Sequence, residues 1–461
     1  MSKKKELIKN TIILMIGKIS TQFISFLLLP LYTTILSAEQ YGIVDLIVTY
    51  VGLLAPIITF QLEMASFRFL IDVRDNIKEE KKILSNVFAV SFLMLFFASI
   101  IIYFVCSLFR FKFTIYFVIL LFTTSLAGIA LQTVRGIGDN IGYSLGSVIA
   151  GGLNVLLNIF FLAILKFHIE GMFLSQVIAN SVCFIFLVFR IKLYKYISLS
   201  YISRKNISQL LKYSLPLIPN GIIWWIINAS DRTIISIFLS ATSNGIYAIS
   251  NKFSNVFISI YNIYNMSWTE SVSLHIKDDT DNFISNMLNT SLKFFATICI
   301  CMISIMPIIF GMMIDKTYHD SYYYIPILLC STFFNILSSM IGAIYVAIKC
   351  TKQISVTSFM AGIINIVINI LFIKHLGIYA AAISTLISFV IMALYRYYDV
   401  KKYIHIAIEC RIIVLILFSF ILVSLCYYTN NIFATLISII YSIVIFIILN
   451  KEMLISFINK K

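Results

Sequence analysis

Residues 36–43 read LSAEQYGI and residues 239–246 read LSATSNGI, so five of eight letters agree at an offset of 203. A second pair follows, because AGGLNVLLNIFF at 150–161 returns as AGIINIVINILF at 361–372, with six of twelve letters identical at an offset of 211. A period of about 200 residues is too long for a solenoid repeat and indicates a duplicated domain. Both pairs keep their order and include polar letters, which disfavours chance similarity among apolar helices.

The composition indicates a lipid environment. Of the 461 residues, 60% are hydrophobic and 12% are charged, whereas soluble domains carry about 25% charged residues. A soluble core cannot bury this much apolar surface, so we predict a membrane protein. The eight cysteines form no CxxC motif and no Cys/His cluster, and the chain has no Walker A or HExxH motif. We therefore expect no cofactor, no metal site and no enzymatic activity.

Apolar stretches of about 20 residues recur along the whole chain, which is the length that crosses a bilayer as a helix. The fold class that they predict is all-α and polytopic, with about 14 transmembrane helices. These helices are expected near 9–35, 42–70, 84–106, 113–134, 141–164, 169–190, 213–239, 244–272, 284–315, 323–348, 354–373, 377–395, 411–428 and 432–449.

The positive charges predict the orientation of these helices. With the N-terminus in the cytoplasm, the inner segments hold 25 Lys and Arg residues, Arg396 among them, while the outer segments hold five and the spans hold five. This bias favours cytoplasmic positions for both termini. The net charge of +15 then follows mostly from topology and suits an anionic inner leaflet. Because the charges are spread over many short loops, we expect no nucleic acid partner.

The repeat and the helix count together predict the domain organisation. An even number of helices per half gives both halves the same orientation, so a two-fold axis along the membrane normal should relate them. We expect an N-terminal six-helix lobe at 1–200, a C-terminal six-helix lobe at 201–400, and two further helices with a cytoplasmic C-terminus at 401–461.

Lys18 is the first candidate for a functional residue. It lies about ten residues into the first helix, roughly 15 Å deep, near the middle of a ~30 Å hydrocarbon core. A lysine at that depth is costly, and Gln22 lies one turn further on the same face. We interpret Lys18 and Gln22 as part of a hydrated cationic cavity. The alternative is a lysine that extends its stem toward the cytoplasm.

Four charged residues in later helices extend this cavity hypothesis. Asp231, Arg232 and Lys252 are expected at a similar depth, about 12 Å from the outer face, and carry a net positive charge. They are equally compatible with a structural ion pair between Asp231 and one of the two cations. Arg68 lies near the cytoplasmic end of its helix, where it could bind phosphate or pair with Glu63 at the interface.

The repeated helices also carry asparagines at a spacing of four residues. Asn154 and Asn158 lie in the first copy, and Asn365 and Asn369 lie in the second. Asn154 and Asn365 are candidates for lining a sugar-binding cavity through amide hydrogen bonds. Such residues also join transmembrane helices to one another, and this alternative stays open.

Several of these stretches resemble a known family. KNTIILMIGKISTQFISFLLLPLYTTILSAEQYGIVDL near the N-terminus, residues 228–253 (NASDRTIISIFLSATSNGIYAISNKF) and residues 361–389 (AGIINIVINILFIKHLGIYAAAISTLISF) are similar to bacterial polysaccharide repeat-unit flippases of the multidrug/oligosaccharidyl-lipid/polysaccharide exporter superfamily. The similarity covers about residues 1–395. It implies two six-helix lobes around a hydrated cationic cavity that alternates between inward and outward openings.

The resemblance also implies a substrate and partners. The substrate is expected to be an oligosaccharide on undecaprenyl pyrophosphate, flipped across the bacterial cytoplasmic membrane, with Lys18, Arg232 and Lys252 as cavity cations. Membrane lipids, a polysaccharide polymerase and assembly proteins are the expected partners. The alternatives are a multidrug or cation antiporter, a flippase for a lipid II-type precursor, and a non-transporting scaffold of a polysaccharide assembly complex.

Overall fold

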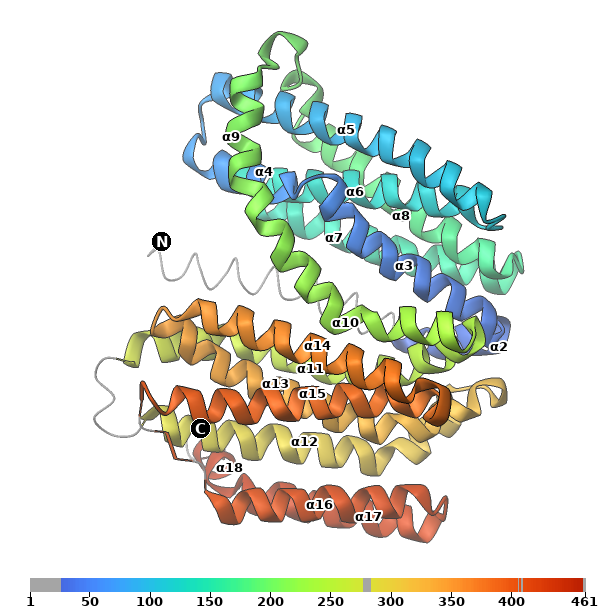
Figure 1. Cartoon of the computed structure of the whole chain (residues 1–461), viewed down its shortest axis with the longest axis vertical. Helices are drawn as coiled ribbons and strands as arrows, with labels where there is room; N and C mark the ends of the chain where they lie inside the picture. Colours follow the sequence, from blue (N-terminus) through green and yellow to red (C-terminus); the bar gives the residue numbers. More distant parts are fainter. Residues whose placement is uncertain (1–25, 277–282, 405, 408, 459–461) are drawn as a thin grey trace. The chain divides into compact units, whose positions relative to one another are not determined.

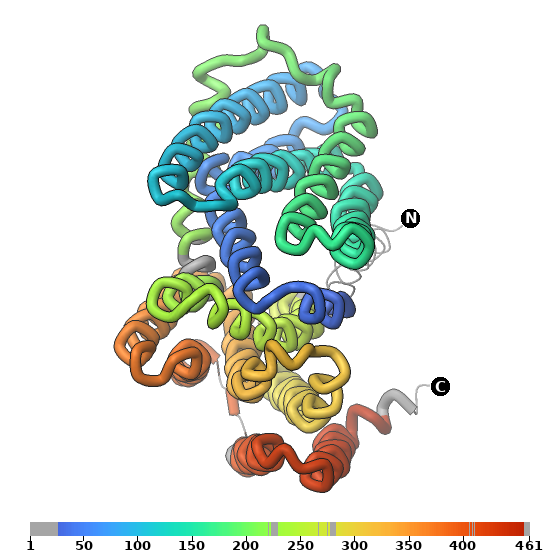
Figure 2. The backbone as a smooth tube through the Cα atoms, turned by 90° about the vertical axis from the view of Figure 1, so that its right-hand side faces the viewer, coloured from blue at the N-terminus to red at the C-terminus, as the bar shows by residue number. Residues whose placement is uncertain are grey.

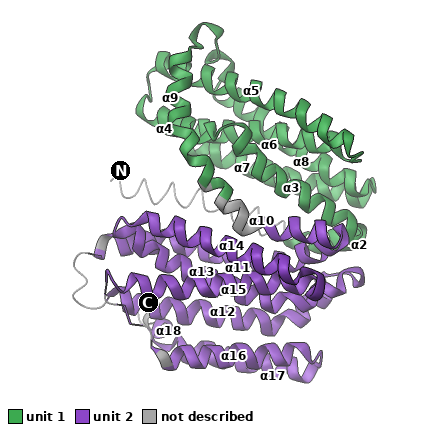
Figure 3. Ribbon diagram, viewed as in Figure 1, with its two compact units in different colours: residues 1–225 green, residues 226–461 purple. Residues whose placement is uncertain are grey.

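A computed structural model describes residues 26–276, 283–404, 406–407 and 409–458. These residues form helices joined by turns, and the described ranges contain no strand. The chain divides into two compact units, residues 1–225 and residues 226–461 (Figure 3). The all-α fold predicted from composition and periodicity is thus confirmed.

Unit 1 is a bundle of long helices with one short amphipathic helix, α9 (Figure 1). Buried apolar side chains from α4, α5, α6 and α9 share one core, as their sequence spacing places these side chains on a single face of each helix. Its helices are α2 (Leu29–Ile35), α3 (Ala38–Ile58), α4 (Leu62–Asp72), α5 (Ile77–Leu108), α6 (Thr114–Ile137), α7 (Asn140–Asn158) with a π-helical extension (Ile159–Ile164), α8 (His168–Arg190), α9 (Arg204–Ser214) and the start of α10 (Ile218–Phe238).

Unit 2 contains the rest of α10 and seven long helices. Helix α13 packs against α11 and α15, and α14 packs against α15. Helices α16 and α17 lie side by side on α12, at the red end of the tube in Figure 2. The helices are α11 (Ala241–His275), α12 (Phe283–Met313), α13 (Ile325–Ala347), α14 (Thr351–Leu376), α15 (Ile378–Val400), α16 (Cys410–Tyr428), α17 (Ile432–Leu449) and the short α18 (Lys451–Ile458).

The sequence repeat at residues 36–43 and 239–246 corresponds to the starts of two helices, α3 and α11. Ser37 precedes α3 and its side chain accepts a hydrogen bond from the backbone N–H of Gln40. Ser240 precedes α11 and accepts from the N–H of Ser243 in the same way. A serine at this position satisfies one of the backbone donors that a helix leaves unpaired at its start. The LSA motif therefore recurs because each half begins an equivalent helix with the same cap.

The single helix predicted over 42–70 is wrong, because the structure divides this stretch into α3 and α4. Pro56 lies in the last turn of α3 and has no N–H to donate. Phe60 and Gln61 then adopt left-handed backbone angles, with φ of 51° and 55°. These conformations are unfavourable for residues with a side chain and cannot continue a right-handed helix. The chain therefore changes direction at residues 59–61.

Eleven helices of the described part are long and apolar enough to cross a membrane. Most of the first predicted helix, 9–35, lies outside the described residues, so the number of fourteen stays a prediction. The lengths and composition of the eleven make the chain a multi-pass membrane protein.

Asp139 connects the start of α7 with the end of α8 and provides a test of the unit 1 packing. Its Oδ1 accepts from the N–H of Gly142 at 2.8 Å, and its Oδ2 lies 2.6 Å from Nε of Arg190. The hydrogen bond from Arg190 lowers the pKa of Asp139. The stabilisation is therefore present above the unfolded-state pKa, near 4, and is lost as the pH falls through the lowered folded-state value.

We expect Asp139→Ala to reduce stability by about 1–2 kcal/mol at neutral pH, because it removes both the helix cap and the ion pair. Asp139→Asn keeps a capping oxygen and should lose less. Thermal unfolding of the detergent-solubilised protein at pH 7 and pH 3 measures both, and the deficit of the asparagine variant should shrink at pH 3. An equal deficit at the two pH values would contradict the ion-pair explanation.

Candidate functional site

Asp231, a buried carboxylate of unit 2, is held by polar side chains from three other helices. Its Oδ2 accepts hydrogen bonds from the hydroxyl of Tyr247 on α11 at 2.8 Å and from Thr385 on α15 at 2.7 Å. Its Oδ1 accepts from Nδ2 of Asn369 on α14 at 2.9 Å. Asp231 itself is only 5% exposed. We refer to Asp231, Tyr247, Asn365, Asn369 and Thr385 as the Asp231 cluster.

Asn365 completes this cluster one turn before Asn369. Its Nδ2 donates to Oγ1 of Thr385 at 2.9 Å, and its Oδ1 accepts a longer bond of 3.4 Å from Ser230. These contacts join α14 to α15 and α10. They agree with the alternative in which the asparagines join helices to one another. The sequence missed Tyr247 and Thr385, which are 16 and 154 residues away from Asp231 and carry no motif of their own.

The cluster has oxygen atoms with unused hydrogen-bonding capacity. Oδ1 of Asn369 is buried and accepts no hydrogen bond from the described residues. The single proton of the Thr385 hydroxyl has two acceptors within reach, Oδ2 of Asp231 at 2.7 Å and the carbonyl of Ala381 at 2.8 Å. A buried carboxylate is costly unless it is protonated or paired with a cation. Carboxylate and amide oxygens together suit a proton or a hard cation.

The described positions of unit 1 that correspond to Asp231 and its partners do not repeat this chemistry. At the 203-residue offset, Asp231 corresponds to Leu28 and Tyr247 corresponds to Val44, and both apolar side chains are buried. In the copy of the asparagine motif, Nδ2 of Asn158 donates to the carbonyl and to Oδ1 of Asn154, so the pair bonds within its own helix. At these positions, therefore, the second copy of the duplicated scaffold carries a polar cluster and the first copy does not.

The remaining predicted residues are placed as follows. Arg232 and Lys252 are partly buried in unit 2, and Arg232 interacts favourably with the charge of Asp231. Arg68 is about half exposed on α4 and forms an ion pair of 2.6 Å with Asp72, so the alternative in which it pairs with Glu63 is wrong. Lys18 and Gln22 lie outside the described residues, and their role stays a prediction.

Glu63 is instead engaged by a neighbour one turn earlier. The hydroxyl of Thr59 donates to its Oε2 at 3.0 Å. Arg68 and Asp72 are also separated by one turn, and their pairing satisfies the arginine on the surface of its own helix. Since a carboxylate four residues away already pairs with Arg68, a phosphate would have to compete with Asp72 for the guanidinium.

A buried arginine was not anticipated from the sequence, which placed Arg396 with the inner loops. Arg396 is 3% exposed. Its Nε donates to Oγ1 of Thr357 at 2.8 Å, and its Nη2 donates to Oγ of Ser358 at 2.9 Å and to the carbonyl of Ile354 at 3.1 Å. Its Nη1 donates to the carbonyl of Ser338 at 3.0 Å. The guanidinium thereby connects α15 to both α13 and α14.

Within the described ranges, no group of three or more His, Cys, Asp and Glu side chains could hold a metal ion. The Asp231 cluster uses one carboxylate together with neutral oxygen donors and is therefore a different kind of site from a transition-metal centre.

Comparison with solved structures shows that the fold of this chain resembles two known folds. A structure of the lipid II flippase MurJ in an inward closed conformation matches with a TM-score of 0.70 and 20% identity, covering 98% of this chain and 100% of the other. An inward-facing multidrug resistance MATE family transporter of the MOP superfamily matches with a TM-score of 0.64 and 15% identity, covering 83% and 94%. At these identities the likeness is one of fold. No curated protein matches the sequence.

Residues 7–269, more than half of the chain, match the family described as polysaccharide biosynthesis protein. This match covers the first half and the start of the second, including α10 with Asp231 and Arg232. With its repeated helices and its likeness to the MurJ and MATE folds, the chain belongs to the polysaccharide biosynthesis protein family.

Proposed function

We propose that this protein flips a polyprenyl-pyrophosphate-linked oligosaccharide repeat unit from the inner to the outer leaflet of a bacterial cytoplasmic membrane. The observation that carries the proposal is the combination of its family, polysaccharide biosynthesis, with a fold like that of a lipid II flippase over 98% of the chain. Both point to a sugar carried on a lipid. The expected partners are undecaprenyl-pyrophosphate-linked oligosaccharide, membrane lipids, a polysaccharide polymerase and assembly proteins.

The physical problem that such a protein solves is the transfer of a polar headgroup. Sugar hydroxyls and a pyrophosphate lose their hydrogen bonds to water if they enter hydrocarbon. In the proposed mechanism, a cationic cavity with Lys18, Arg232 and Lys252 replaces that water while the polyprenyl tail stays in the lipid. Alternating access requires two conformations of similar free energy. Outward movement of negative charge gains about 2.3 kcal/mol per charge for every 100 mV of inside-negative potential.

We expect Lys18→Ala and Arg232→Ala each to abolish restoration of surface polysaccharide in a flippase-deficient strain, because each removes a cation that would bind the pyrophosphate. Immunoblots of membrane fractions should show normal amounts of both variants. Lys316→Ala, at an exposed position just after α12, is the matched control and should complement fully. Full complementation by both cavity variants would remove Lys18 and Arg232 from the mechanism.

The Asp231 cluster favours a second candidate, a multidrug or cation antiporter. A buried carboxylate with one spare amide oxygen beside it, that of Asn369, has chemistry that suits cation coupling. Under this candidate, deletion of the gene should change drug resistance and leave surface polysaccharide unchanged. Under the flippase proposal, the same deletion should remove surface polysaccharide and cause the lipid-linked oligosaccharide to accumulate in the inner leaflet.

A further inference from the structure

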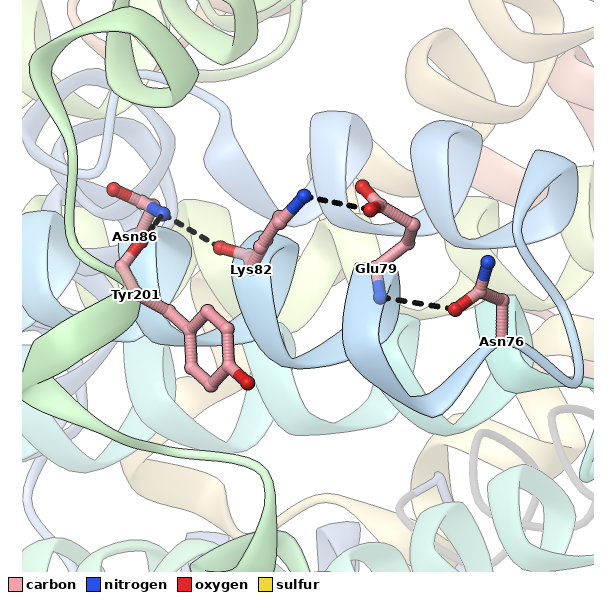
Figure 4. A network of polar contacts seen from close by, with 5 residues as sticks. All are labelled: Asn76, Glu79, Lys82, Asn86 and Tyr201. Carbon is pink, nitrogen blue, oxygen red and sulfur yellow. Dashed lines mark hydrogen bonds and ion pairs between the residues drawn. The ribbon is translucent and has the colours of Figure 1, made fainter.

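The chain that follows α8 is attached to the first turns of α5 by a buried asparagine. Nδ2 of Asn86 donates to the carbonyl of Tyr201 at 2.9 Å and to that of Lys82 at 2.6 Å. Its Oδ1 accepts from the backbone N–H of Ser203 at 3.0 Å. Figure 4 shows Asn86 beside Tyr201, with Lys82, Glu79 and Asn76 following toward the start of α5. Asn86 is fully buried, so water does not compete for the hydrogen bonds that attach the linker.

A serine next to Asn86 holds the preceding part of the same linker. Oγ of Ser85 donates to the carbonyl of Tyr196 at 3.1 Å and accepts from the N–H of Ser198 at 2.9 Å. Leu193 packs in the unit 1 core, together with Leu210 of α9. The linker therefore has a defined position on unit 1, although its only helical parts are two short 3-10 turns at 193–195 and 199–201.

The same attachment occurs in unit 2 at the repeat offset. Asn289 lies 203 residues after Asn86, and its Nδ2 donates to the carbonyls of Ser285 and Ala407. The N–H of Glu409 donates to its Oδ1 at 3.4 Å. The duplication thus includes the docking of the chain that follows each repeated half, and Asn289 provides a matched reference for Asn86.

In unit 1, the docked linker exposes large apolar side chains together with lysines. Leu199 is 84% exposed, Tyr194 is 57% exposed and Ile197 is 42% exposed. The exposed Lys192 and Lys195 lie between and beside them in the sequence. We refer to these five residues as the linker face. Large apolar side chains interleaved with lysines are typical of segments that lie in the headgroup region of a bilayer.

The linker is also attached to α5 at the level where a membrane boundary is expected. Helix α5 has 32 residues, which corresponds to about 48 Å, whereas the hydrocarbon core needs only about 20 residues. All charged residues of α5 fall within 78–82, and 83–108 carries none. The membrane boundary should therefore lie close to Ser85 and Asn86, which are the residues that hold the linker.

We propose that the linker face binds anionic phospholipid headgroups of the leaflet at which α5 begins. The lysines attract the headgroups, and Tyr194, Ile197 and Leu199 enter the boundary between headgroups and acyl chains. The exposed Arg204, Lys205 and Lys212 of α9 add positive charge beyond the linker. The charge complementarity favours an anionic lipid surface over a protein partner. The inference does not depend on which substrate the protein carries.

A tryptophan reporter tests this proposal in the full-length protein. Tyr194→Trp is reconstituted into phosphatidylcholine vesicles that contain either brominated phosphatidylglycerol or brominated phosphatidylcholine at the same mole fraction. The signal is the quenching beyond that of the protein with its three native tryptophans. We expect brominated phosphatidylglycerol to quench several-fold more strongly at low salt, and the excess to fall in 0.5 M NaCl because salt screens the attraction.

Neutralising the lysines should remove this preference. Each lysine near the surface favours anionic lipid by roughly fivefold, so Lys192→Gln with Lys195→Gln should lower the excess quenching at least fivefold. Phe433→Trp, which is 73% exposed at the start of α17 and has no charged neighbour in sequence, is the control and should be quenched equally by both lipids. Ile197→Trp is a second reporter if Tyr194→Trp does not fold.

The attachment itself is tested by Asn86→Ala. Hydrogen exchange of residues 193–203 should become faster, and the lipid preference of the reporter should decrease, whereas Asn289→Ala should change neither. Equal quenching by the two brominated lipids, or a preference that neutralisation of both lysines leaves undiminished, would overturn the proposal. Absence of quenching by either lipid would place the linker face away from the bilayer and would favour a protein partner.

Discussion

Asp231→Asn is expected to reduce restoration of surface polysaccharide by roughly 5- to 150-fold, the range that follows from a coupling free energy of about 1–3 kcal/mol. Asparagine has nearly the same volume as aspartate, so the packing of α10 against α14 and α15 should persist. It cannot take up a proton or balance the charge of a bound cation, which is the role that we propose for Asp231 in coupling the flippase to a cation or proton. The variant therefore removes the ionisable group while leaving the fold of unit 2 intact.

The measurement is complementation of a flippase-deficient strain, with immunoblots of membrane fractions to confirm that the amount of protein is unchanged. Asp320→Asn, at an exposed position outside the cluster, is the matched control and should behave as wild type. In vesicles, replacing Na⁺ by a bulky organic cation and varying the pH distinguish a cation from a proton at this site. Wild-type complementation by Asp231→Asn would exclude a functional role for the carboxylate.

Arg396→Met is expected to destabilise the protein by about 2–4 kcal/mol. Methionine keeps much of the apolar stem of arginine but has no donor, so four acceptors on α13 and α14 lose their hydrogen bonds, at about 1 kcal/mol each. Removing a buried charge offsets part of this loss. Since three helices meet at this guanidinium, the effect should appear as reduced stability of unit 2.

Thermal unfolding in detergent measures this loss, and a fluorescence-based size-exclusion profile reports the folded fraction. Arg411→Met, at an exposed position in α16, is the control and should unfold at the wild-type temperature. Arg396→Lys should be intermediate, because an ammonium group has three donors without the planar geometry of guanidinium. If Arg396→Met unfolds at the wild-type temperature, the hydrogen bonds of the guanidinium do not contribute to the stability of unit 2.

Features that depend on local order along the chain could be predicted from the sequence. The apolar stretches predicted an all-α membrane protein because a backbone in lipid must satisfy its own hydrogen bonds. The repeat at residues 36–43 and 239–246 marked equivalent helix starts, and a serine cap acts within three residues of itself. The division near Pro56 had a local signal too, although the direction change also needed the left-handed backbone at Phe60 and Gln61.

Features that depend on contacts between distant helices were decided by the tertiary structure. The sequence singled out Asp231 and Asn365 as polar residues in apolar surroundings, but it could not show that Tyr247 and Thr385 join them, because any hydroxyl on a buried helix face looks alike in sequence. Arg396 shows the same limit: its place near a helix end predicted a loop cation, and only packing against α13 and α14 makes it a buried donor. Periodicity and capping act locally, whereas a buried polar side chain takes its role from the groups that the fold brings within about 3 Å.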